Sequence, residues 1–280
     1  MTHGAIVLCG GLSSRMGRPK ALLPWRGTTM IAHVVGILKR AVSEVIVVAS
    51  EELHLPPLDA TVVRDREPKL GPLAGLREGL EALGADLAFA TSTDAPFITE
   101  AFVTTMLSFG CAAAPDVEGF VQTLSAVYPK SLAPKAAELI AQQRMSVQFL
   151  LEAADFRRVR AHELPDLDSI RGFNTPDEYL AAVRKEPSAD PVRVEFLGLS
   201  RTKTSTPTFD ALPAKLGEIL DAASLRLNAA PLLSGGAVVP HFLISLNGEL
   251  FLRDLNVPIG PGERVLIMDA AAGFERASEN

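Results

Sequence analysis

Near its N-terminus the chain reads AIVLCGGLSSRMGRPKALL from Ala5 to Leu23. Its first four residues form an apolar run without a polar break, the pattern of a strand buried on both faces. Gly10 and Gly11 follow closely, and glycines allow the backbone to bend tightly and to approach a ligand. Arg15 and Lys20 then supply cations suited to phosphate oxygens. Because exposed backbone N–H groups in such a loop form an anion-binding concavity, the stretch predicts a polyphosphate site.

The loop differs from the standard phosphate-binding motifs. The P-loop has two glycines four residues apart, followed directly by Lys and Ser or Thr. Here five residues separate Gly11 from Gly17, and Lys20 comes two residues later than that motif requires. The dinucleotide fingerprint GxGxxG is also absent. A glycine-rich turn with solvated cations is the alternative, but the agreement of several separate features favours a phosphate site of another kind.

Further along the chain, strands alternate with helices. Helical spacing covers residues 28–40, and buried strands are predicted at 45–49, 61–63 and 87–91. This alternation predicts an α/β fold with right-handed crossovers and a mostly parallel sheet. In open sheets of this kind, ligands bind beyond the carboxyl ends of the strands. We therefore expect the glycine-rich loop, Asp65 and Asp94 to converge at one edge, since each follows a predicted strand.

Two of the downstream loops have alternative interpretations. Asp94 lies at a strand end before Pro96, where a carboxylate can bind Mg²⁺ that keeps most of its waters, but Asp-x-Pro is also a common turn. The segment from Gly71 to Gly75 places backbone N–H groups at a helix N-terminus, a good partner for a phosphate or a base edge. It would also suit an ordinary helix that starts at Pro72.

Composition excludes several classes of protein. The 280 residues suggest about two domains, and 48% hydrophobic and 21% charged residues are ordinary for a globular chain. A net charge of −6 argues against nucleic-acid binding. No apolar stretch approaches the ~20 residues of a membrane span, and the first apolar run stops at Gly10, too early for a signal peptide. Cys9 and Cys111 provide neither a disulfide framework nor zinc-ligand spacing, so a reducing cytoplasm is the expected compartment.

Residues 8–27, LCGGLSSRMGRPKALLPWRG, resemble the signature of the nucleotidyltransferase superfamily that activates sugars and cofactors. Within it, the stretch is most similar to the molybdenum cofactor guanylyltransferases, with Cys9 in place of an alanine. The resemblance implies a Rossmann-like, mostly parallel sheet with helices on both faces. It also implies transfer of GMP from GTP to the phosphate of molybdopterin, with release of pyrophosphate and Mg²⁺ as cofactor. The Gly10-Gly11 pair favours GTP, because cytidylyl relatives usually carry alanine-glycine there.

The same resemblance assigns the site residues. Arg15, Lys20 and Asp94 are the expected catalytic residues, with Arg15 and Lys20 on the β- and γ-phosphates and Asp94 on the metal. The expected nucleotide-binding residues are Leu8, Cys9, Gly10, Gly11, Lys20, Asp65, Gly71, Gly75 and Asp94. Gln122 and Asn174 are the candidates on the pterin side, although Gln122 replaces a family histidine and Gly172 stands where a second asparagine is frequent. No general base is expected, because the second pKa of a phosphate monoester is about 6.

The C-terminal part has a different pattern. A polar, Pro-flanked linker covers residues 185–191, and alternation at 192–196 predicts a half-exposed strand. A helix at 212–227, a tight hairpin at Asn247-Gly248 and a last strand at 262–268 predict a small α+β domain. It resembles the ubiquitin-like β-grasp of the small subunit of molybdopterin synthase. The predicted domains are therefore 1–187 and 192–275.

The working end of that small subunit is a free terminal Gly-Gly, whereas here Gly273 stands alone before further residues. A docking or oligomerisation role is therefore favoured over sulfur transfer, with other proteins of molybdenum cofactor synthesis as candidate partners. Three functions remain open. They are a guanylyltransferase acting on molybdopterin, a related enzyme that uses CTP or a sugar phosphate, and a non-catalytic scaffold of the same pathway.

Overall fold

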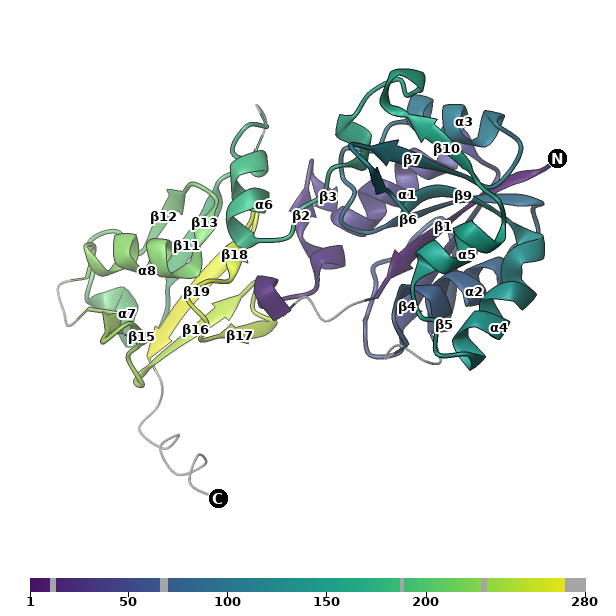
Figure 1. Cartoon of the computed structure of the whole chain (residues 1–280). Coiled ribbons are helices and arrows are strands. Elements are labelled where there is room, and N and C mark those ends of the chain that lie inside the picture. The colour runs from purple at the N-terminus through teal and green to yellow at the C-terminus, as the bar shows by residue number, and fades with distance from the viewer. Residues whose placement is uncertain (11–13, 66–69, 187–188, 228–230, 270–280) are drawn as a thin grey trace. The chain divides into compact units, whose positions relative to one another are not determined.

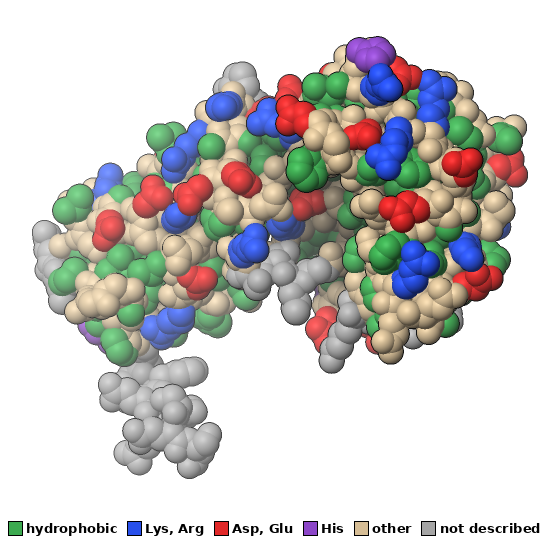
Figure 2. All heavy atoms as spheres, viewed as in Figure 1, with side chains coloured by type: hydrophobic (Ala, Val, Ile, Leu, Met, Phe, Trp, Pro, Cys, Tyr) green, Lys and Arg blue, Asp and Glu red, His purple; other side chains and the backbone are tan. Residues whose placement is uncertain are grey.

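The structure is a computed structural model that describes residues 1–10, 14–65, 70–186, 189–227 and 231–269 (Figure 1). The chain divides into two compact units, and on the face shown in Figure 2 both units carry basic and acidic side chains interspersed with hydrophobic ones. The first unit spans residues 1–12, 19–22 and 29–172, and the second spans 13–18, 23–28 and 173–280. Among the described residues, none of the helices combines the length and the apolar character needed to cross a bilayer.

The first unit is built on a mixed, parallel-rich sheet whose main path runs in the order β10-β7-β9-β6-β1-β4-β5, with β8 paired to β7. Its strands are β1 (His3–Cys9), β4 (Glu44–Ser50), β5 (Thr61–Asp65), β6 (Leu87–Ser92), β7 (Ala113–Val117), β8 (Phe120–Val121), β9 (Ser125–Pro129) and β10 (Arg157–Arg160). The central pairs β6·β1, β1·β4 and β4·β5 are parallel. The predicted parallel core is therefore confirmed, and β9 adds an antiparallel neighbour to β6.

Helices cover both faces of this sheet (Figure 1). They are α1 (Met30–Ala41), α2 (Pro72–Ala82), α3 (Glu100–Ser108), α4 (Ala133–Ala141) and α5 (Val147–Ala153). Strand β1 shows why: Ala5 and Val7 pack into the core beneath α1 and α3, whereas Ile6 and Leu8 pack beneath α2, α4 and α5. An apolar run without polar breaks suits a strand that is buried on both sides.

Local sequence explains the positions of α1 and α2. In α1, Thr29 accepts a hydrogen bond from the Ala32 N–H, which caps the helix. Helix α2 lies close against β1 at Gly79, where an added Cβ would come within 2.6 Å of Ile6 Cγ2. The glycine thus allows a close helix–strand contact.

The sequence pattern of residues 120–127 also predicts a single strand, and this prediction was wrong in extent. A turn splits the stretch into β8 and β9, and in this turn Gln122 N donates to Pro115 O at 2.8 Å and Ser125 N donates to Gln122 O at 3.3 Å. These hydrogen bonds, one to β7 and one within the turn, replace the continuous strand pairing that the sequence pattern indicates.

The second unit contains a five-stranded sheet in the order β12-β11-β19-β16-β17. Its strands are β11 (Val192–Phe196), β12 (Thr208–Ala211), β16 (Phe242–Leu246), β17 (Leu250–Leu252) and β19 (Arg264–Asp269). Strands β11 and β19 are parallel, and the other pairs are antiparallel. Helix α8 (Leu216–Ser224) shares its buried core. This is an α+β arrangement of one sheet and one main helix; the resemblance to ubiquitin-like proteins remains a prediction.

The unit also contains shorter elements. They are α6 (Pro176–Val183), α7 (Leu199–Thr202), the paired strands β13 (Ala214–Lys215) and β18 (Pro258–Ile259), and the paired strands β14 (Leu233–Ser234) and β15 (Ala237–Val238). Between the glycine-rich loop and α1, the chain forms the single turns η1 (Ser14–Met16) and η2 (Lys20–Leu22) and the paired strands β2 (Pro24–Trp25) and β3 (Thr28–Thr29). Of these, η2 belongs to the first unit. The predicted helix 212–227 begins only at Leu216, because the preceding residues form β13. Asn247 and Gly248 both have positive φ, 57° and 83°, as a tight hairpin turn requires.

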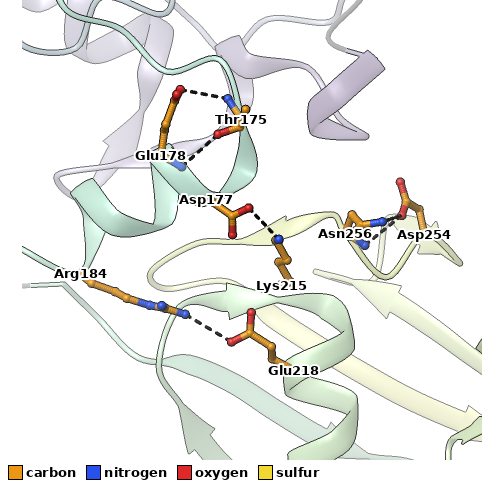
Figure 3. A network of polar contacts seen from close by, with 8 residues as sticks. All are labelled: Thr175, Asp177, Glu178, Arg184, Lys215, Glu218, Asp254 and Asn256. Carbon is orange, nitrogen blue, oxygen red and sulfur yellow. Dashed lines mark hydrogen bonds and ion pairs between the residues drawn. The ribbon is translucent and has the colours of Figure 1, made fainter. Parts of the chain in front are cut away.

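Helix α6 belongs to the second unit, although the sequence places residues up to 187 in the first domain. Two ion pairs connect it to β13 and α8, Asp177–Lys215 at 2.8 Å and Arg184–Glu218 at 3.6 Å (Figure 3). A capping box in which Thr175 and Glu178 exchange hydrogen bonds starts the helix (Figure 3). The predicted domain limits, 187 and 275, lie outside the described residues.

Residues 13–18 also belong to the second unit. Arg18 Nη2 lies 2.7 Å from Glu263 Oε1, and the two side chains are only 8% and 5% exposed. Glu263 accepts a further hydrogen bond from Gly260 N at 2.7 Å. Gly17 has φ 64°, and a Cβ there would lie 2.7 Å from Val257 Cγ2, so this position favours glycine on two grounds.

Candidate functional site

A pocket of about 130 Å³ opens at the carboxyl ends of β1, β5 and β6 in the first unit. It is lined by Leu8, Gly10, Val48, Asp65, Gly71, Pro72, Gly75, Ser92 and Leu124. The structure thus brings together five of the predicted nucleotide-binding residues, Leu8, Gly10, Asp65, Gly71 and Gly75. This is the edge of the sheet where parallel strands of this kind place ligands.

The N-terminus of α2 forms one wall of the pocket. Gly71 precedes the helix with φ 78°, a backbone conformation that favours glycine. A Cβ on Gly75 would lie 3.4 Å from Leu8 Cδ2, 3.6 Å from Val48 Cγ1 and 4.0 Å from Asp65 Oδ2. The absence of a side chain at Gly75 therefore leaves space between the apolar wall and the Asp65 carboxylate.

Asp65 ends β5 and is buried, with 8% of its surface exposed. The neighbouring Arg64 turns elsewhere: its Nη1 donates to Ser50 O and Leu53 O, both at 2.9 Å. Arg64 therefore fixes the loop that follows β4. The rest of the charged run that the sequence shows after Asp65, residues 66–69, lies outside the described part of the chain.

Asp94 and Lys20 form an ion pair beside this pocket. Lys20 Nζ lies 2.7 Å from Asp94 Oδ2, with 19% and 29% of the side chains exposed. The other carboxylate oxygen, Oδ1, accepts a hydrogen bond from Ser92 Oγ at 2.5 Å, and Ser92 lines the pocket. Thr93 N donates to Leu8 O at 3.4 Å, which fixes the turn before Asp94 to the end of β1. The predicted convergence of Lys20 and Asp94 is therefore present.

A second contact supports the same turn from α1. His33 Nε2 lies 3.1 Å from the carbonyl oxygen of Pro96. The bond requires a proton on Nε2, since a carbonyl oxygen only accepts. We therefore assign His33 to the turn after Asp94 and give it no role in proton transfer.

Other predicted residues have different positions. The side chain of Cys9 lies in the core on the α1 side, and burial raises its pKa to about 12. Only the backbone of Cys9 is therefore available to a ligand. Gly11 lies outside the described residues, and Arg15 and Asn174 belong to the second unit. Their roles toward a nucleotide or a pterin remain predictions from the sequence.

The pterin-side candidate Gln122 lies in the turn between β8 and β9 and is absent from the pocket lining, to which Leu124 contributes. Gly172 stands where the resemblance implies a second asparagine, and the structure gives a steric reason for the glycine. A Cβ at this position would overlap the carbonyl oxygen of Asp94, so an asparagine side chain does not fit this backbone.

Comparison with known proteins identifies the first unit. The family described as MobA-like NTP transferase domain matches residues 5–159, more than half of the chain. The chain belongs to this family. The residues 5–159 are called the MobA-like domain below, and membership makes this part of the chain a nucleotidyltransferase.

Several relatives carry the name "Probable molybdenum cofactor guanylyltransferase". One from Mycobacterium tuberculosis is 34% identical in an alignment of 183 residues that covers 61% of this chain and 91% of the relative. Another, from Bacillus cereus, is 30% identical in an alignment of 190 residues that covers 64% of this chain and 95% of the relative. The chain is therefore similar to these proteins over nearly their whole length.

Solved structures show the same fold at lower identity. Molybdopterin-guanine dinucleotide biosynthesis protein A from Archaeoglobus fulgidus has a TM-score of 0.54 at 22% identity, over 64% of this chain and 96% of that one. The 2-C-methyl-D-erythritol 4-phosphate cytidylyltransferase from Thermus thermophilus has a TM-score of 0.51 at 18% identity, with the same coverage of both chains. These likenesses show the α/β nucleotidyltransferase fold of the MobA-like domain.

Four residues that line the pocket were not among the predicted nucleotide-binding residues, namely Val48, Ser92, Leu124 and Pro72, the last of which lies inside the predicted segment from Gly71 to Gly75. Ser92 and Val48 could have been found by strand alternation, because each shares a sheet face with Leu8 and lies near the end of a predicted strand. Leu124 follows a turn that the pattern of residues 120–127 does not reveal.

The donor set of the MobA-like domain fits a magnesium ion that arrives with a nucleotide. Among the described residues, no three His, Cys, Asp or Glu side chains gather in a metal-binding group. Mg²⁺ is commonly bound by one or two carboxylates, with substrate phosphates and water as its other ligands. The partly exposed Asp94, next to the pocket, provides a carboxylate of this kind.

Proposed function

We propose that the MobA-like domain transfers GMP from GTP to the phosphate of molybdopterin and releases pyrophosphate, as a molybdenum cofactor guanylyltransferase. The names of its relatives support this substrate pair. The observation that carries the proposal is the Lys20–Asp94 pair, with 2.7 Å between Nζ and Oδ2, beside a pocket at the strand ends. It supplies a cation for phosphates and a carboxylate for a metal in one place.

The pocket has groups suited to a nucleobase. Leu8, Val48 and Leu124 offer apolar surface to the faces of a base. An ionised carboxylate only accepts hydrogen bonds, so Asp65 suits a base edge that carries N–H donors, such as that of guanine. Gly71 and Gly75 lie at the helix N-terminus, where backbone N–H groups attract negative charge.

The reaction needs positioning and charge neutralisation more than proton transfer. The attacking phosphate monoester is largely ionised at neutral pH, because its second pKa is about 6. It attacks the α-phosphorus of GTP, and the bond to the β-phosphate oxygen breaks. Lys20 then stabilises the charge that accumulates on the leaving pyrophosphate, and Arg15 is proposed to do the same for its outer phosphate.

We further propose that Mg²⁺ is the cofactor and that Asp94 binds it. When bound, Mg²⁺ neutralises phosphate charge and orients the reacting groups. The protein's own part is to present the Asp94 carboxylate in a fixed direction and to keep Lys20 within reach of the same phosphates.

The second unit is proposed to bind other proteins of molybdenum cofactor synthesis, and the reaction is proposed to take place in a reducing cytoplasm. Cys9 and Cys111 are both free thiols, which agrees with that compartment. Residues 270–280, which include Gly273, lie outside the described part of the chain. The preference for a docking or oligomerisation role over sulfur transfer therefore stays a prediction from the sequence.

The deciding experiment incubates the full chain with molybdopterin, Mg²⁺ and each nucleoside triphosphate in turn. Pyrophosphate release and the mass of the pterin dinucleotide are measured together. We expect product with GTP and none with CTP. Turnover with CTP would favour the cytidylyl alternative, and binding of molybdopterin without turnover of any nucleotide would favour a scaffold.

A further inference from the structure

We propose that Ser92 is a positioning residue, which orients the Asp94 carboxylate toward the divalent cation of the nucleotide complex. This inference rests on the proposed function of Asp94. It adds a residue that neither the sequence signature nor the family resemblance identifies, and it assigns the two oxygens of Asp94 different tasks.

The two oxygens of Asp94 have different partners. Oδ1 accepts from Ser92 Oγ at 2.5 Å, and Oδ2 lies 2.7 Å from Lys20 Nζ. A hydroxyl has a single proton to donate, and the proton of Ser92 is committed to Asp94. A lysine ammonium is a mobile point charge on a flexible chain, so Lys20 can turn to a phosphate. Ser92 then keeps Oδ1 in place and leaves Oδ2 for a cation.

The backbone of Ser92 is well fixed for this task. Ser92 is the last residue of β6 and pairs in parallel register with Leu8 of β1. The next residue, Thr93, also donates to Leu8 O. The hydroxyl and the carboxylate are thus two residues apart on a turn attached to the central strand, so the contact needs little movement of the backbone.

The residue before it provides a matched control. Thr91 is fully buried, and no partner for its Oγ1 is found within the described residues. Alternation along β6 directs Thr91 to the opposite face of the sheet from Ser92. Thr91→Val therefore removes a hydroxyl from the same strand without changing the contact to Asp94.

The test measures metal binding apart from turnover. Mn²⁺ is titrated into GTP with and without the full chain, in the absence of pterin, and free Mn²⁺ is followed by electron paramagnetic resonance. The difference between the two titrations gives the Mn²⁺ that binds through the protein. Hydrogen bonds to charged groups have strengths that correspond to about tenfold or more in affinity. We expect Ser92→Ala to weaken Mn²⁺ binding by about that factor, Ser92→Thr to restore it, and Thr91→Val to bind as the unaltered chain does. GTP affinity in EDTA should fall much less than Mn²⁺ affinity does in Ser92→Ala.

Two results would overturn the inference. One is Mn²⁺ binding in Ser92→Ala that equals or exceeds that of the unaltered chain, which would mean that Ser92 only competes for the carboxylate. The other is an equal loss of GTP affinity in EDTA, which would make Ser92 a part of the pocket alone. Thermal melting of each variant confirms that it is folded.

Asp94→Asn separates this inference from the proposed function. If Asp94→Asn abolishes Mn²⁺ binding and Ser92→Ala leaves it intact, only the role of Ser92 fails. If Asp94→Asn itself binds Mn²⁺ normally, the metal assignment of Asp94 fails, and the inference about Ser92 is overturned with it.

Discussion

The ammonium nitrogen of Lys20 lies 2.7 Å from Oδ2 of Asp94, although 74 positions separate the two residues in the sequence. The parallel pairing of β1 and β6 explains this contact. Two neighbouring parallel strands end at the same edge of the sheet, so the segments that follow them meet. In the absence of phosphates the two charges neutralise each other. When a nucleotide binds with its metal ion, Lys20 would pair with a phosphate instead and Asp94 would bind the metal.

Lys20→Ala should lower kcat by about 10²–10³, because one group that stabilises developing charge typically contributes that much. Initial rates of pyrophosphate release with saturating GTP and molybdopterin test this. Lys39→Ala is the control, since Lys39 pairs with the exposed Asp59. A Lys20→Ala protein with normal kcat would exclude the proposed role of Lys20.

Gly75→Ala should raise the KM for GTP with little effect on folding. The added methyl group would lie at ordinary contact distances from Leu8 and Val48, which also line the pocket, and would therefore take up part of the pocket's space. Gly36→Ala is the matched control. Gly36 is an exposed residue of α1 with no atom within 4 Å of an added Cβ. We expect Gly36→Ala to stabilise the chain by about 0.5–1 kcal/mol and to leave KM unchanged. Equal KM values for both variants would argue against the pocket as the nucleotide site.

Glu263→Gln should destabilise the second unit by about 3 kcal/mol, since it leaves the guanidinium of Arg18 buried without its counter-charge. Chemical denaturation followed by circular dichroism measures the change. The control is Glu195→Gln, because Glu195 lies 4.0 Å from Arg264 in a pair that is half exposed. That change should cost less than about 1 kcal/mol. Similar losses in both variants would contradict a special contribution of the buried pair.

Cys9 should resist alkylation at pH 8, whereas Cys111 should react. Burial raises the pKa of Cys9 to about 12, and the thiolate is the reactive species. At pH 8 the thiolate fraction of Cys9 is therefore very small, and it grows only as the pH approaches 12. Cys111 is exposed. Mass spectrometry after iodoacetamide treatment should find one modified cysteine in the folded chain and none in Cys111→Ser. Rapid modification of Cys9 would contradict its burial.

Much of the first unit could be predicted from the sequence because its signals are local. The unbroken apolar run Ala5–Leu8 predicts a strand buried on both faces, and β1 has helices on both sides. The spacing of Ile31, Val34, Val35 and Leu38 predicts the buried face of α1, and all four are buried. The hairpin at Asn247-Gly248 follows from residues that tolerate positive φ.

Other features depend on partners that are distant in sequence. The pattern of residues 120–127 indicates one strand, but hydrogen bonds at Gln122 divide it. The start of α8 moves to Leu216, because Ala214–Lys215 pair with Pro258–Ile259. No local pattern reports a strand partner more than forty residues away.

The sequence by itself determined the family, the alternation of strands and helices, and the residue types of a phosphate and metal site. Only the tertiary structure decided that Ser92 contacts Asp94 and that the side chain of Cys9 faces the core. It also decided that residues 13–18 belong with the second unit, through Arg18 and Glu263. The physical reason is that secondary structure follows from the periodicity of neighbouring residues, whereas the pairing of two charges or the opening of a pocket depends on which strands lie side by side.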